Sequence, residues 1–160
     1  MLDPENSPPE NNLPDKLKLH FDGGADKNPG GVAVYGWFIT DEHGKEISSG
    51  YGVASAYTAL ATNNFAEYCA LGFGLRWLKE QKWKGQLEIL GDSQLVIYQM
   101  IGRWKCNAEH LIKLRNRCLK YLEGITYTAR WIPREQNSRC DELGHVAYRE
   151  FTGKDHPKKK

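Results

Sequence analysis

The stretch KLKLHFDGG, residues 16–24, alternates polar and apolar side chains and then runs into Asp22 and a pair of glycines. An alternation with a period of two is typical of a strand that buries one face. Residues 32–40, after a turn rich in Gly, Asn and Pro, are largely β-branched and aromatic, and a hairpin loop at 41–44 leads to a further strand over 45–53. Because short connections favour antiparallel pairing, the sequence predicts a sheet that begins with three antiparallel strands.

The rest of the chain alternates between helical and strand patterns. A period of 3.6 residues predicts a first helix that ends near Gln81, and one of its faces contains Phe65, Ala66, Cys69, Ala70, Phe73 and Trp77. The elements predicted after it are a strand over 87–92, helices over 93–101 and 109–122, a strand over 126–132 and a helix over 138–151. A β-α-β crossover makes the strands that start at Lys16 and Leu87 parallel neighbours. The predicted fold is α/β, with a mixed five-stranded sheet (three antiparallel strands plus two parallel) and helices on both faces.

Length and composition indicate one domain with two short tails. A chain of 160 residues with 40% apolar and 26% charged side chains is ordinary for a soluble globular protein, and it is long enough to bury a core. Residues 1–15 contain four prolines and hardly any apolar side chain, so we expect a disordered tail there. Residues 154–160 are predicted to form a basic, solvated tail, which leaves residues 16–153 as the ordered domain.

Several classes of protein are disfavoured by the same composition. A net charge of +2 is too small to indicate a nucleic-acid binder by itself. No segment approaches the roughly 18 consecutive apolar residues that a membrane span needs, and the first residues lack the pattern of a secretory signal. The four cysteines form no Cys-x-x-Cys pair, which disfavours a zinc site. We therefore expect a reduced, cytoplasmic protein.

Four acidic residues lie at the ends of predicted elements. Asp22 and Asp92 each follow an apolar strand, Glu67 lies in the first turn of the first helix, and Asp141 opens the last helix. Ligands bind beyond the carboxyl ends of parallel strands, where these side chains would converge. Converging carboxylates repel one another unless cations lie between them, and Mg²⁺ prefers oxygen ligands. The pattern predicts bound metal and two-metal phosphodiester chemistry.

Each acidic residue also has a structural interpretation. Asp22 with its two glycines could form a turn, and Asp92 could cap the helix that follows it. Ser138-x-x-Asp141 fits a capping box, and Glu67 would be stabilised by the positive end of its helix. Asn63 and Asn64 could be caps as well, so the residues alone leave these alternatives open.

Four motifs follow one another along the chain: FDGG at 21–24 with NPG at 28–30, TNNFAE at 62–67, GDSQ at 91–94 and NSRCDEL at 137–143. Together they resemble the type 1 ribonuclease H family, and they occur in that family's order. The resemblance covers about residues 16–151 and implies a ribonuclease H-like fold. It also implies that the protein cleaves the RNA strand of RNA–DNA hybrids with two Mg²⁺ or Mn²⁺ ions.

The resemblance also implies a role for each site residue. Asp22 would bridge both ions, with Glu67 and Asp92 completing one metal site and Asp141 the other. The residues expected to contact the RNA minor groove and its 2′-hydroxyls are Asn28, Asn63 and Gln94. Those expected to contact the DNA strand or other parts of the substrate are Thr62, Asn64, Trp104, Arg134 and Asn137.

The chain departs from the family in two segments. Many members carry a histidine in the loop before the last acidic residue, whereas the loop at 132–137 has none, and Arg134 is the residue there that could contact a phosphate. His145, one turn after Asp141, could face the site, but a packing or surface role is favoured. The segment at 102–107 is too short for the basic protrusion of some members, which predicts weaker substrate affinity or dependence on a partner for it.

The expected function is that of a monomeric endoribonuclease that leaves 5′-phosphate and 3′-hydroxyl ends. Two alternatives stay open: a nuclease of the same fold that also cleaves double-stranded RNA, and a non-catalytic nucleic-acid-binding domain.

Overall fold

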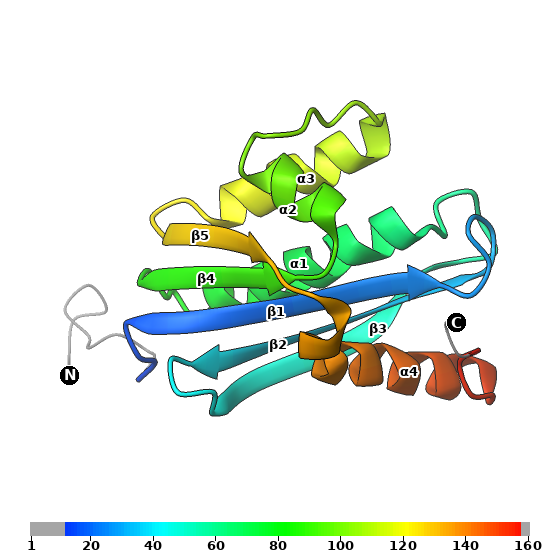
Figure 1. Cartoon of the computed structure of the whole chain (residues 1–160), viewed down its shortest axis with the longest axis horizontal. Coiled ribbons are helices and arrows are strands. Elements are labelled where there is room, and N and C mark those ends of the chain that lie inside the picture. The colour runs from blue at the N-terminus through cyan, green and yellow to red at the C-terminus, as the bar shows by residue number, and fades with distance from the viewer. Residues whose placement is uncertain (1–11, 158–160) are drawn as a thin grey trace, which may run out of the picture.

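The computed structural model describes residues 12–157 and contains the mixed sheet that the sequence predicts (Figure 1). Its strands are β1 (Lys16–Ala25), β2 (Val32–Asp41), β3 (Glu46–Ala56), β4 (Gln86–Gly91) and β5 (Thr126–Trp131). Their order in the sheet is β3-β2-β1-β4-β5. β1 to β3 pair antiparallel, whereas β4 pairs parallel with both β1 and β5, which confirms the predicted fold class.

Four α-helices cover the two faces of this sheet (Figure 1). They are α1 (Asn63–Glu80), α2 (Gln94–Met100), α3 (Glu109–Tyr121) and α4 (Ser138–Thr152), and a 3₁₀ helix at Arg134–Gln136 precedes α4. α1 packs on the face of β1 that carries Leu19 and Gly23, whereas α4 packs on the other face, against Gly36 of β2. Successive side chains of a strand point to opposite faces of the sheet. The side chain of Asp22, next to Gly23, therefore lies on the face that α4 covers.

The core lies between the sheet and α1. Leu19 and Phe21 of β1 are fully buried, together with Tyr68, Leu71 and Leu75 of α1. The predicted helix face was partly wrong, because Phe73 is 40% exposed and contacts Tyr35 edge-on at the rim, with 4.8 Å between ring centroids. Tyr68, Leu71, Leu75 and Leu78 instead form the inward row at helical spacing.

Both predicted tails are attached to the fold where the structure describes them. Residues 1–11 and 158–160 lie outside the described part of the chain. At the N-terminal side, Trp83 Nε1 donates to Pro14 O at 2.8 Å and Gln86 N donates to Asp15 O at 2.7 Å. At the other end, Asp155 and His156 contact α4, whereas Lys154, Asp155 and Pro157 are exposed to solvent.

Candidate active site

A close contact between β1 and α1 brings the first two acidic residues together. A Cβ at Gly23 would lie 2.3 Å from Ala66 C and 2.5 Å from Glu67 N, so only glycine allows the two backbones to approach this closely. Asp22 precedes this glycine and Glu67 follows Ala66, which places both carboxylates at one junction. Asp22 lies inside β1 rather than at its end, because the strand continues to Ala25.

The structure gathers three of the four predicted carboxylates into one group. The ligand oxygens of Asp22, Glu67 and Asp92 all lie within 4.8 Å of one another. Asp22 is 7% and Glu67 8% exposed, and Asp92 is half-buried. Their negative field reaches Cys140, where burial first and then these three carboxylates raise the pKa of the thiol well above its ordinary value. A compact, partly buried set of oxygen donors fits a hard divalent cation.

Asp141 lies beside this group, not within it. It lines a small cavity together with Asp22, Gly144, His145 and His156. His145 Nε2 lies 3.5 Å from Asp141 Oδ1, and both side chains are about one-third exposed. The fourth carboxylate therefore adjoins Asp22 and remains accessible.

The helix caps are made by residues other than the acidic ones. Thr62 Oγ1 accepts from Phe65 N and caps α1, and Ser93 Oγ accepts from Val96 N and caps α2. α4 begins after Asn137, which makes no side-chain cap bond, so Ser138 is not the cap of a capping box. The interpretations of Asp92, Asn63 and Asn64 as N-caps are therefore wrong, as is the capping box proposed for Asp141.

Asn137 is hydrogen-bonded to the group of three carboxylates. Its side chain is 1% exposed, and its Nδ2 donates to Phe21 O at 2.9 Å and to Asp92 Oδ1 at 3.3 Å. The sequence predicted a substrate contact for Asn137. In this position the amide orients Asp92 and joins the start of α4 to the interior of β1 and to the residue after β4, and the substrate contact stays a prediction.

Two of the predicted RNA contacts form a network at the junction of β1 and α1. Asn63 N donates to Asn28 Oδ1 at 3.2 Å, and Ala25 N donates to Asn63 Oδ1 at 2.8 Å. The loop that carries Asn28 is shaped by Asp26, whose Oδ1 accepts from Val32 N at 2.7 Å and from Lys27 N at 2.7 Å. Both asparagines are thereby held at the rim of the carboxylate group.

The other predicted substrate residues are at the surface. Asn64 and Gln94 are exposed in the first turns of α1 and α2, and Arg134 is exposed in the 3₁₀ helix before α4. Trp104 is 45% exposed, and its ring contacts Tyr98 edge-on at 5.0 Å. All four side chains are available to a ligand.

Comparisons with known proteins agree with this geometry. Residues 20–147 match the family described as reverse transcriptase-like. Ribonuclease H of Idiomarina loihiensis is 31% identical over 146 residues, which cover 82% of this chain and 87% of that protein. The chain belongs to the ribonuclease H family.

Other members of the ribonuclease H family are similar over the same domain. Ribonuclease HI of Halobacterium salinarum is 34% identical over 133 residues, which are 82% of this chain but only 64% of that protein. The crystal structure of LC11-RNase H1 in complex with RNA/DNA hybrid matches with a TM-score of 0.76 at 29% identity, covering 84% of this chain and 98% of that one. The sheet and helices described above are therefore a ribonuclease H fold.

Two structural features of this ribonuclease H domain were not predicted from the sequence. The position of Asn137 just before α4, next to a predicted site, is the sequence feature that indicates its burial. The return of His156 to the cavity that Asp22 and Asp141 line had no such signal, because nothing local predicts a contact with His145. Among the described residues, no helix has the length and apolarity that crossing a bilayer requires.

Proposed function

We propose that the protein is an endoribonuclease that hydrolyses the RNA strand of RNA–DNA hybrids. The observation that carries this proposal is the convergence of Asp22, Glu67 and Asp92 within 4.8 Å in a chain of the ribonuclease H family. The similarity to a ribonuclease H whose structure contains an RNA/DNA hybrid supports the choice of substrate.

The donor set supports a site for divalent cations. Asp22, Glu67 and Asp92 would supply oxygen ligands to one ion, and Asp141, which adjoins Asp22, would supply a ligand to a second. When bound, two Mg²⁺ or Mn²⁺ ions would lower the pKa of a water for attack on phosphorus and stabilise the departing 3′-oxygen, giving 5′-phosphate and 3′-hydroxyl ends. The chain's own contribution is to hold the carboxylates in place, through the close contact at Gly23 and the amide of Asn137.

Recognition of the hybrid is assigned to the rim of the site. Asn28, Asn63 and Gln94 carry amides, which both donate and accept hydrogen bonds, and the 2′-hydroxyl that distinguishes RNA from DNA does the same. Thr62, Asn64, Trp104 and Arg134 would contact phosphates and sugars. Because such contacts do not read base edges, cleavage should be largely independent of sequence.

The test is cleavage of an end-labelled RNA–DNA hybrid with and without Mg²⁺ or Mn²⁺. We expect cleavage only with metal, and loss of at least about a hundredfold in Asp92→Asn, because a metal ligand has been removed. Glu123→Gln, a carboxylate-to-amide change at an exposed position after α3, is the matched control and should keep wild-type activity. Activity in Asp92→Asn, or cleavage in chelator, would contradict the proposal.

The same assay decides between the alternatives. A matched RNA duplex tests the broader nuclease, and binding of the hybrid without cleavage would identify a non-catalytic domain. We further propose that the protein acts as a monomer in the cytoplasm, and the four free cysteines support the reducing compartment.

A further inference from the structure

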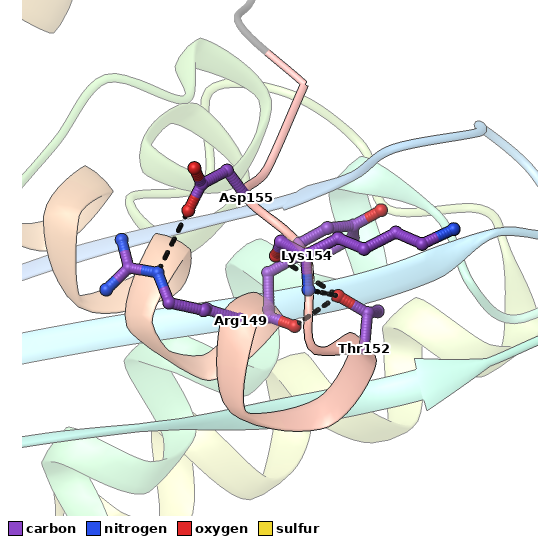
Figure 2. A network of polar contacts seen from close by, with 5 residues as sticks. Arg149, Thr152, Lys154 and Asp155 are labelled. Atoms are coloured by element: carbon purple, nitrogen blue, oxygen red, sulfur yellow. Dashed lines mark hydrogen bonds and ion pairs between the residues drawn. The ribbon is translucent and has the colours of Figure 1, made fainter.

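The chain reverses direction at the end of α4 and returns along the helix. Gly153 ends α4 in the left-handed conformation, with φ of 75°, and its N–H donates to Arg149 O at 2.8 Å. Thr152 Oγ1 donates to Tyr148 O at 2.8 Å and accepts from Lys154 N at 3.1 Å. Figure 2 shows this turn, with Arg149 Nε donating to Asp155 Oδ1 at 3.0 Å across it. These contacts fix residues 153–157, here called the return segment, to the last turns of α4.

The return segment ends at the cavity of the active site. The His156 ring stacks on His145, with 4.9 Å between centroids and 15° between planes, and it meets Tyr148 edge-on at 4.6 Å. His156 also lines the small cavity that Asp22 and Asp141 line. His145 in turn lies beside Asp141, with Nε2 3.5 Å from Oδ1. A direct chain of contacts thus leads from the return segment to the fourth carboxylate.

Tyr148 connects the return segment to a second part of the site. Its hydroxyl donates to Asp26 Oδ2 at 2.8 Å, and Asp26 shapes the loop that carries Asn28. His156 therefore contacts two residues of α4. His145 adjoins Asp141, and Tyr148 holds the loop that carries Asn28.

The ion pair in the turn does not by itself explain this arrangement. The Arg149 side chain is 59% and that of Asp155 87% exposed, and exposed ion pairs contribute little to stability. The terminal residues of a domain are usually poorly ordered unless something ties them down. Here the aromatic contacts of His156 with His145 and Tyr148 supply the additional attachment.

We propose that His156 is a positioning residue of the active site, which holds His145 against Asp141 and thereby keeps Asp141 next to Asp22. This role rests on the proposed function, since it concerns the carboxylate assigned to the second ion. It depends on the shape and stacking of the His156 ring.

Two substitutions at position 156 separate stacking from other roles. We expect His156→Ala to lower kcat on the hybrid about tenfold, the loss typical of removing a residue that supports a metal ligand, with little change in KM. His156→Phe keeps an aromatic ring for both contacts and should recover most of the activity. His43→Ala, in the exposed hairpin between β2 and β3, is the matched control and should be unaffected. Wild-type kcat in His156→Ala, or equal losses in the Ala and Phe variants, would overturn the proposal.

A readout without metal or substrate keeps this test separate from the proposed function. In the metal-free protein, the ring signals of His145 in NMR spectra should shift in His156→Ala and stay close to wild type in His156→Phe, because a stacked ring imposes a ring-current shift. Unchanged His145 signals in His156→Ala would overturn the positioning role. If the wild type fails to cleave the hybrid but these shifts occur, the contact stands and the proposed substrate is wrong.

Discussion

Asn137 and Asp92 lie 45 residues apart in the sequence, and the Asn137 amide donates to Asp92 Oδ1 at 3.3 Å while also donating to Phe21 O at 2.9 Å. One buried nitrogen thus fixes a carboxylate of the site and the main chain just before Asp22. The orientation of Asp92 is therefore set by the start of α4, although Asp92 itself follows β4.

Replacement of Asn137 by Asp should damage both activity and stability. The new carboxylate cannot donate to Phe21 O, and its charge repels Asp92. We expect kcat to fall about 10–100-fold and the metal-free protein to lose about 1–3 kcal/mol of unfolding free energy. Steady-state kinetics and urea unfolding measure the two effects. Asn116→Asp, at an exposed position of α3, is the control. Wild-type kcat in Asn137→Asp would show that the amide does not orient Asp92.

Removing one charge from the carboxylate group should stabilise the protein when metal is absent. Asp22, Glu67 and Asp92 are crowded within 4.8 Å, so Glu67→Gln relieves repulsion. We expect a gain of about 1 kcal/mol in chelator, a smaller rise in Tm on adding Mg²⁺, and loss of cleavage. Thermal unfolding with and without Mg²⁺ checks this. Glu80→Gln, at the exposed end of α1, should change stability by less than about 0.5 kcal/mol. A less stable Glu67→Gln protein in chelator would contradict the repulsion.

The sequence predicted the strands and the convergence of acidic residues because both follow from local patterns. Period-two alternation in residues 16–21 identifies β1, and the β-α-β crossover places β1 and β4 side by side, as the structure confirms. Asp22 and Asp92 then meet on neighbouring strands, and Glu67 joins them from the second turn of α1, not from the first turn that the sequence predicted.

Other features of the structure depend on tertiary contacts, which local sequence patterns did not predict. Period alone did not say which face of α1 would be inward, and Phe73 was assigned to the same face as Ala66 and Ala70 although it lies at the rim. The sequence interpretation gave the cap of α4 to Ser138, but the helix begins at that residue and Asn137 turns inward. Residues 154–157 lack an apolar pattern, so their contact with α4 depends on His145 and Tyr148, which no local signal reveals.

The glycine between Asp22 and Gly24 should tolerate no side chain. A Cβ at Gly23 would meet Ala66 C at 2.3 Å and Glu67 N at 2.5 Å, and these main-chain atoms cannot move aside without shifting α1. We expect Gly23→Ala to cost about 1–3 kcal/mol of stability through overpacking and to separate Glu67 from Asp22, with loss of kcat. Gly72→Ala is the matched control within α1. Its Cβ would meet only Cys118 Sγ at 3.7 Å, so it should be neutral or stabilising by about 0.5–1 kcal/mol. Equal effects of the two changes on urea unfolding would contradict the close contact.

Loss of the Tyr148 hydroxyl should weaken substrate binding more than turnover. The Tyr148 hydroxyl donates to Asp26 Oδ2 at 2.8 Å. Burial alone would raise the pKa of Asp26, but hydrogen bonds from Val32, Tyr148 and Lys27 outweigh burial and hold that pKa below its ordinary value. We expect Tyr148→Phe to raise KM several-fold and to lower stability by about 1 kcal/mol. A carboxylate whose pKa is lower in the folded chain than in the unfolded chain stabilises the fold at pH values above its unfolded pKa. The difference in stability between wild type and Tyr148→Phe should therefore shrink as pH falls and Asp26 becomes protonated. Tyr57→Phe, whose side chain is 71% exposed, should match wild type. A stability difference that is constant down to acid pH would show that the hydroxyl does not act through Asp26.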